Sequence, residues 1–402
     1  MIETSAMQDH DPSPVMSADS SARTPPLRVL MVAPSLDMLG GQAVQAARLL
    51  ERWSEDPALE VTLLPINPRL PGSLRKLQTI KYIRTIVTSL YYCATLLARV
   101  GRYDVIHIFS ASYLSFVLAP TPAILVAKLY GKKTLLNYRS GEAKDHLQRW
   151  RRTALPIIRL VDTIVAPSAY LVDVFAHFGL QARWIFNFVQ TDRFRFRERR
   201  PLRPIFLSNR NFEPLYNVAC VLRAFALIQK DFPEACLTLV GDGSQRAELE
   251  NLAQELRLRN TQFIGIVAPE KMPELYDAAD IYLNGSDIDN MPGSIIESYA
   301  SGLPVVTTDA GGIPYILTDQ DTGLMVPRGD HQAMAACAIR LLEDQALAFA
   351  IIGRARAECQ KYSWPAVRGE WLKLYHEVWS ARGARGSEQT SSGEVRGVRV
   401  VG

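Results

Sequence analysis

The chain has 402 residues, of which 48% are hydrophobic, and a formal net charge of +4. This length exceeds what one ordinary hydrophobic core supports and predicts two domains of comparable size. The small charge and the scattered basic residues argue against a nucleic-acid-binding protein. Five cysteines without any C-x-x-C spacing indicate reduced, buried thiols of a cytosolic protein rather than disulfides or a metal site.

The two ends of the chain differ in composition from the rest. Residues 1–26 lack the basic start and apolar core of a secretory signal, so we expect a disordered leader. Residues 382–402 are rich in Gly, Ser and Arg and are expected to form a disordered tail. No apolar run reaches the roughly eighteen residues of a membrane-spanning helix.

Residues 27–189 alternate short apolar, β-rich runs with helical stretches, as in a parallel α/β sheet. The polar, Arg-rich linker 190–203 interrupts this rhythm, and a second series follows in residues 204–362. The expected fold class is therefore α/β, with two doubly wound, Rossmann-like domains facing each other across a cleft. Strands are predicted at 28–34, 60–66, 104–109, 133–137, 163–166, 183–186, 205–208, 236–241, 262–265, 281–284, 304–308 and 323–326.

Two helical regions stand apart from this alternation. Residues 74–100 carry apolar side chains at helical spacing with basic residues around them, which suits either a peripheral contact with an anionic membrane or a core helix. The C-terminal helices near 331–343, 345–361 and 365–380 have no strands between them and are expected to brace the domains. The last of them, within 363–381, is expected to pack back toward the N-terminal domain.

Two carboxylates eight residues apart form the motif with the clearest chemical meaning. Asp289 is predicted on a loop after a buried strand, and Glu297 on the helix that follows Pro292. Carboxylates accept paired hydrogen bonds from diols, while backbone N–H groups at this helix start and at Gly311-Gly312 can receive phosphate or sugar oxygens. Diol and phosphate recognition together suggest a nucleotide sugar.

Other interpretations of single motifs remain open. Asp287-Ile-Asp289 has the D-x-D form of a metal-phosphate site, but the same form recurs at Asp319-Gln-Asp321, so metal binding is not expected. Gly40-Gly41 lacks the G-x-G-x-x-G spacing of a dinucleotide site and could be a tight turn. His107 lies in an apolar strand and fits a core residue better than a catalytic one.

The motifs together resemble those of retaining GT-B glycosyltransferases of family 4 (glycosyl transferases group 1), over roughly 27–379. Val29-Leu-Met-Val-Ala-Pro with Gly40-Gly41 is similar to the family's first strand and glycine loop. In the second half, Gly241-Asp-Gly243, the stretch from Asp289 to Glu297, Gly302-Leu-Pro-Val-Val306 and Gly311-Gly312 follow the family's order and spacing.

The resemblance implies roles for individual residues. Glu297 would hold the nucleotide ribose, and Asp289, where the family usually has Glu, would contact the transferred sugar. Arg210 would bind the diphosphate, although Leu215 and Tyr216 occupy the neighbourhood of the family's lysine. The family often has a histidine that faces the donor sugar, and Arg139 is the closest match to that position in this chain. Arg139 could also supply the positive charge of the missing lysine.

The resemblance also implies an activity: retaining transfer of a hexose from a nucleoside diphosphate sugar, such as a UDP-sugar, to a glycan or lipid-linked acceptor. The expected pathways are polysaccharide, lipopolysaccharide or glycolipid biosynthesis, in the cytoplasm or at the cytoplasmic face of a membrane, without metal or other cofactor. A catalytically weakened nucleotide-sugar-binding module and a nicotinamide-dependent oxidoreductase remain alternatives. The expected catalytic residues are Arg139, Arg210, Asp289 and Glu297, and the expected donor-binding residues are Gly40, Gly41, Arg210, Gly241, Gly243, Gly293, Ser294, Glu297, Gly311 and Gly312.

Overall fold

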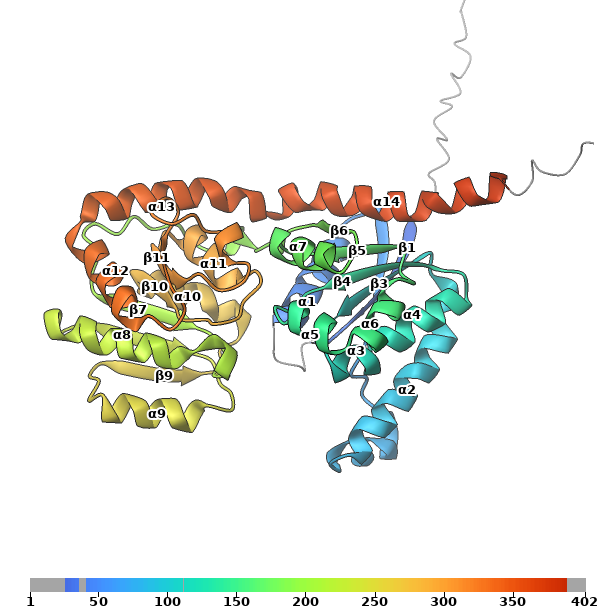
Figure 1. The fold of residues 1–402 in the computed structure, drawn as a ribbon, viewed down its shortest axis with the longest axis horizontal. Helices are drawn as coiled ribbons and strands as arrows, with labels where there is room; N and C mark the ends of the chain where they lie inside the picture. The colour runs from blue at the N-terminus through green and yellow to red at the C-terminus, as the bar shows by residue number, and fades with distance from the viewer. Residues whose placement is uncertain (1–25, 36–40, 111, 389–402) are drawn as a thin grey trace, which may run out of the picture.

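The computed structural model describes residues 26–35, 41–110 and 112–388, so the predicted leader, most of the predicted tail and Gly40 lie outside the described residues. Two six-stranded parallel sheets form its framework, one in each half of the chain. Figure 1 shows the two halves side by side, with the C-terminal helices running along one side of both. The predicted α/β fold with two Rossmann-like domains is confirmed.

The N-terminal sheet has the strand order β2-β1-β3-β4-β5-β6. β1 pairs with β2 on one side and with β3 on the other, so that Val29 lies beside both Val61 and Val105. Its strands are β1 (Leu27–Ala33), β2 (Leu59–Pro65), β3 (Val105–Ser110), β4 (Lys133–Tyr138), β5 (Thr163–Ala166) and β6 (Ala182–Trp184). Its helices are α1 (Gly41–Ser54), α2 (Ile83–Arg99), α3 (Leu114–Leu118), α4 (Pro120–Leu129), α5 (Ala143–Arg149), α6 (Arg151–Ile158) and α7 (Ala169–His177).

The C-terminal sheet has the order β12-β11-β10-β7-β8-β9, with its first strand, β7, near the middle. Its strands are β7 (Ile205–Asn209), β8 (Cys236–Val240), β9 (Thr261–Gly265), β10 (Ile281–Asn284), β11 (Val305–Thr308) and β12 (Leu324–Val326). Its helices are α8 (Val218–Asp231), α9 (Arg246–Glu255), α10 (Met272–Ala278), α11 (Gly293–Ser301), α12 (His331–Glu343) and α13 (Gln345–Cys359).

The central strands are buried along their whole length because helices cover both faces of each sheet. Every residue of β3, β10 and β11 is buried. Each sheet therefore has its own hydrophobic core on one face, with α4 and α7 against the N-terminal sheet and α8 and α12 against the C-terminal one.

The long helix α14 (Trp364–Glu388) covers the other face of the N-terminal sheet. Trp371 and Tyr375 of this helix are buried against strand residues that include Met31. His107 belongs to this core, with its Nδ1 atom 2.7 Å from the Tyr375 hydroxyl and its Nε2 atom 3.1 Å from Asn137 Nδ2. Burial lowers the pKa of His107 to about 3, so the imidazole is neutral and structural.

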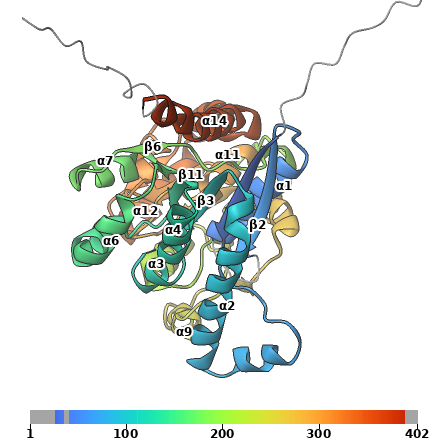
Figure 2. The ribbon, with the colours of Figure 1, turned by 90° about the vertical axis from the view of Figure 1, so that its right-hand side faces the viewer.

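The segment formed by η1 (Gly72–Thr79) and α2 projects from the N-terminal domain, as Figure 2 shows. Only Tyr92 and Leu96 of α2 are buried. Tyr92 and Leu96 join the hydrophobic core of the N-terminal domain, whereas Ile83, Ile86, Leu90 and Leu97 are exposed, so only one side of α2 fits the core-helix interpretation. Among the helices of the described residues, none is long and apolar enough to span a bilayer.

Candidate active site

The strand order of the C-terminal sheet reverses at β7, since the next strand along the chain, β8, lies on one side of it and β10 lies on the other. In doubly wound sheets, ligands bind outside the carboxyl ends of the strands at such a point. Arg210 follows β7, Gly241 follows β8 and Asp289 follows β10. The topology therefore brings three of the predicted site residues to one edge.

Arg210 and Asp289 form an ion pair at this edge, and their side chains are only 12% and 10% exposed. Burial disfavours the charge of Arg210, but the Asp289 carboxylate outweighs it and raises the pKa of the guanidinium. The guanidinium carbon also lies 4.2 Å from the centre of the Tyr216 ring. Tyr216, in the neighbourhood where the resemblance predicts a lysine, thus supports Arg210 by a cation–π contact.

The carboxyl end of β7 carries buried polar atoms without partners. Ser208 Oγ, Asn209 Oδ1 and Arg210 Nε are buried and have no hydrogen-bond partner among the described residues. They come from three consecutive residues at the carboxyl end of β7. Because a buried polar atom without a partner costs free energy, this arrangement favours a polar ligand at the edge.

Glu297, on α11, is 9% exposed and has two donors. The Tyr276 hydroxyl donates to Oε2 over 2.8 Å, and Arg48 Nη2 donates to Oε1 over 2.9 Å. Burial raises the pKa of Tyr276 well above its ordinary value, so the hydroxyl keeps its proton. Arg48 lies on α1, so this ion pair joins the two domains. Sequence reasoning missed Arg48, and only its place shortly after the glycine loop could have marked it.

The double glycine turn, Gly311-Gly312, packs directly on the acid loop, the segment 285–292 that carries Asp289. A Cβ atom on Gly312 would lie 1.8 Å from the carbonyl oxygen of Asn290, and one on Gly311 would lie 2.0 Å from that of Asp289. The Gly312 N–H donates to the Asp289 carbonyl over 3.0 Å. This corrects the expectation that the Gly312 N–H faces a ligand, because it positions the carboxylate loop instead.

Gly241 and Gly243 have the same kind of role beside Arg210. A Cβ on Gly241, whose φ is +145°, would lie 2.2 Å from the Arg210 carbonyl oxygen, and one on Gly243 would lie 2.5 Å from that of Phe212. Only glycine allows the turn after β8 to approach the Arg210 backbone so closely. These glycines therefore set the position of the arginine.

Arg139, at the end of β4, belongs to the N-terminal wall of the site. Its guanidinium carbon lies 5.3 Å from the centre of the Phe109 ring, and its Nη2 atom donates to Asn187. Burial lowers the pKa of Arg139 to about 9, which leaves it charged at neutral pH. Its carbonyl oxygen accepts a hydrogen bond from Asn290 Nδ2 over 3.5 Å, so the structure places Arg139 beside the acid loop.

The acid loop, residues 285–292, lies between the two domains. The Ser168 hydroxyl bonds to Asn290, and Asn187 Nδ2 donates to the Met291 carbonyl over 3.4 Å. A hollow of about 400 Å³ opens beside the loop, lined by Asp287, Asp309, Pro327 and Arg328. The site is thus an interface in which each domain contributes charged groups.

The remaining predicted residues lie at helix starts. Gly293 and Ser294 begin α11, whose N-terminus has no side-chain cap. Gly41 begins α1.

The two carboxylates of Asp287-Ile-Asp289 have separate partners: Asn217 for Asp287 and Arg210 for Asp289. Within the part of the chain that the structure describes, no group of three or more His, Cys, Asp or Glu residues could hold a metal ion.

Known proteins share the fold and part of the sequence of this chain. Residues 190–358 match the family model for glycosyl transferases group 1. Among solved structures, the fold is similar to sucrose-phosphate synthase of Thermosynechococcus elongatus (TM-score 0.70, 20% identity, 88% of this chain and 100% of that one). It is also similar to Anabaena HepE in complex with UDP and glucose (TM-score 0.68, 18% identity, 87% and 99%). The chain has the GT-B glycosyltransferase fold.

Two curated relatives of this GT-B chain are glycosyltransferases. It is 29% identical to a phosphatidyl-myo-inositol mannosyltransferase of Mycolicibacterium smegmatis over 186 residues, which are 44% of this chain and 46% of that protein. It is 27% identical to a sulfoquinovosyl transferase of Arabidopsis thaliana over 325 residues, 75% of this chain and 61% of that protein. The chain thus spans about half to three fifths of the length of these relatives.

Proposed function

We propose that the protein is a retaining family 4 glycosyltransferase that transfers a hexose from a nucleoside diphosphate sugar to a glycan or lipid-linked acceptor. The observation that carries the proposal is the Arg210–Asp289 ion pair at the β7 edge, where Ser208 Oγ, Asn209 Oδ1 and Arg210 Nε are buried without partners in the described part of the chain. The Tyr276 hydroxyl connects this edge to Glu297, because it bonds to both Asn209 and Glu297. The proposed pathways are polysaccharide, lipopolysaccharide or glycolipid biosynthesis. The glycosyltransferase relatives favour this function over a nicotinamide-dependent oxidoreductase.

Glu297 would bind the ribose diol. Each of its oxygens already accepts one hydrogen bond, from Tyr276 or Arg48, and each has a second lone pair for a ribose hydroxyl. The hydrogen bonds from Tyr276 and Arg48 would hold the carboxylate in a fixed orientation before the nucleotide sugar binds. Ribose recognition therefore requires no rearrangement of Glu297.

Arg210 would stabilise the departing diphosphate. One Nη atom bonds to Asp289 while Nε is unpaired, so the guanidinium could hold the carboxylate and a phosphate at once. Charge that develops on the leaving group would then meet a preorganised cation in a buried site. Asp289 would contact the transferred sugar, and Arg139 would add positive charge from the opposite domain.

The family resemblance implies front-face transfer with retention of configuration, in which the departing phosphate takes the proton of the acceptor hydroxyl. No protein nucleophile and no metal are needed in this proposal. It includes a cytoplasmic location with a peripheral membrane contact through residues 74–100.

The test incubates the protein with a panel of nucleotide sugars and of lipid-linked or oligosaccharide acceptors. Acceptor-dependent release of nucleotide, with the anomeric configuration of the donor kept in the product, supports the proposal. Tyr216, in place of the lysine that the resemblance predicts beside the diphosphate, favours a second candidate function, a catalytically weakened nucleotide-sugar-binding module. That module would bind the nucleotide but release none in response to any acceptor.

A further inference from the structure

The segment between β2 and β3 has a charge distribution unlike that of the rest of the chain. Residues 61–103 contain seven Lys and Arg residues and no Asp or Glu, whereas the whole chain carries only +4. Among the described residues, no carboxylate forms an ion pair with Arg75, Lys76, Lys81 or Arg84. The positive charge of these four residues is therefore available to an anionic ligand.

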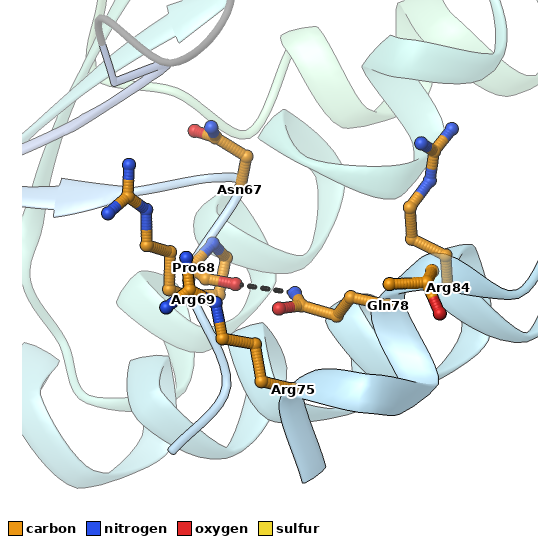
Figure 3. A pocket seen from close by; sticks show the side chains of 7 residues that line it. Asn67, Pro68, Arg69, Arg75, Gln78 and Arg84 are labelled. Carbon is orange, nitrogen blue, oxygen red and sulfur yellow. Dashed lines mark hydrogen bonds between the residues drawn. The ribbon is translucent and has the colours of Figure 1, made fainter. Parts of the chain in front are cut away.

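Three arginines of the segment line one pocket of about 360 Å³, which Figure 3 shows from close by. Arg69 lies on the loop after β2, Arg75 on η1, and Arg84 in the first turn of α2. Gln78 fastens these parts together: it accepts from the Leu70 N–H over 3.1 Å and donates to the Pro68 carbonyl over 2.9 Å. It also donates to Thr88 Oγ1 over 3.1 Å. The arginines are thus carried by a hydrogen-bonded framework.

An apolar surface adjoins this pocket. Ile83, Ile86, Leu90 and Leu97 of α2 are between 40% and 66% exposed. Their spacing places Ile83, Ile86, Leu90 and Leu97 along one side of the helix. A row of large exposed apolar side chains beside a basic pocket suits a ligand with an anionic head and a hydrocarbon chain.

The pocket also lies on the cleft side of the N-terminal domain. Asn67, which lines it, bonds to Ser35 through two hydrogen bonds of 3.0 Å and 2.9 Å. Ser35 follows β1 and Asn67 follows β2, so both stand at the carboxyl edge of the N-terminal sheet. Arg139 follows β4 at this same edge and contacts the acid loop. A ligand bound in the pocket could therefore extend along this edge toward the donor site.

We propose that this pocket binds the phosphate or diphosphate of a lipid-linked acceptor, whose hydrocarbon chain lies along the exposed side of α2. The inference rests on the proposed transferase function and names the class of its acceptor. Guanidinium groups bind phosphate in a bidentate manner, and the apolar side chains remove the hydrocarbon from water. The acceptor sugar would then reach the cleft from the membrane surface.

The test measures binding of decyl diphosphate and of inorganic pyrophosphate by titration calorimetry. The pocket variant combines Arg75→Gln and Arg84→Gln, and the matched control combines Arg151→Gln and Arg152→Gln at exposed positions of α6. We expect about fivefold weaker binding of decyl diphosphate per pocket arginine, roughly 25-fold for the pair, and no change in the control.

A second variant, Ile86→Ser with Leu90→Ser, should weaken decyl diphosphate binding and leave pyrophosphate binding unchanged. Equal binding by wild type and pocket variant would overturn the proposal. Pyrophosphate that binds as tightly as decyl diphosphate would overturn the lipid assignment and indicate a soluble anion. Titration of UDP into the same samples distinguishes failure of the acceptor-pocket proposal from failure of the proposed transferase function. A wild-type protein that binds decyl diphosphate but no UDP would contradict the proposed function alone.

Discussion

Substitution of Gly312 by alanine tests whether the double glycine turn positions the acid loop. A Cβ atom there would lie 1.8 Å from the Asn290 carbonyl oxygen, whereas real Cβ contacts stay beyond 3.0 Å. The shortfall from 3.0 Å to 1.8 Å is 1.2 Å, and the turn or the loop must move by at least that much. Overpacking of this kind costs about 1–3 kcal/mol. For a domain of this size, Tm should fall by about 2 to 12 °C.

The matched control is Gly353→Ala, because a Cβ atom on this exposed helical glycine meets nothing within 4 Å. That variant should gain up to about 1 kcal/mol, since alanine favours helix over glycine. Tm from scanning calorimetry and UDP affinity from titration are measured on both. Gly312→Ala should also bind UDP more weakly, because the loop carries Asp289, the ion-pair partner of the proposed diphosphate-binding residue Arg210. Wild-type Tm and wild-type UDP affinity in Gly312→Ala would refute the reasoning.

Four further predictions concern single side chains. Glu297→Ala should raise the Kd of UDP by about 10- to 100-fold, since charge-assisted hydrogen bonds contribute about 1.5–3 kcal/mol each. Arg210→Ala should lower kcat by about 10²- to 10³-fold, because it removes the stabilisation of the leaving group. Unchanged kinetics in both variants would place the site elsewhere. Arg48→Ala should raise the Kd of UDP several-fold, because the Glu297 carboxylate loses the partner that orients it. The control Arg52→Ala removes a more exposed ion pair and should match wild type. Equal changes of Kd in both variants would contradict a positioning role of Arg48. Burial lowers the pKa of His107 from its ordinary value of about 6.5 to about 3 in the folded protein. As the pH falls below 6.5, the unfolded state therefore takes up a proton that the folded state does not, and the free energy of unfolding decreases. At pH 5 this should cost about 2 kcal/mol, and a His107→Gln variant with the same slope of unfolding free energy against pH would contradict the assignment.

Residue patterns predicted most of the fold. All twelve strands lie within two residues of their predicted positions. Helices cover both faces of the central strands, which are therefore rich in apolar residues, and the sequence pattern detects such short apolar runs. Helix α2 could not be assigned in this way. An apolar stripe has the same spacing whether the rest of the protein covers it or leaves it exposed, and only the exposed fractions of Ile86 and Leu90 distinguish the two cases.

The candidate site was less accessible to sequence reasoning. The contact between Arg48 and Glu297 joins residues 249 positions apart, and no local pattern indicates which arginine of α1 faces the other domain. The role of Gly312 was misassigned for a related reason. A glycine at a turn can present its N–H to a ligand or allow close packing, and only the distance to Asn290 decides between them.

The central claim is that Arg210, Asp289 and Glu297 form the donor site of a retaining sugar transferase. Its most direct test is a reaction with nucleotide sugars and lipid-linked acceptors in which nucleotide release and the anomeric configuration of the product are followed together. The account predicts acceptor-dependent release of nucleoside diphosphate and a product with the configuration of the donor. A product of inverted configuration, or no acceptor-dependent release with any donor of the panel, would contradict it.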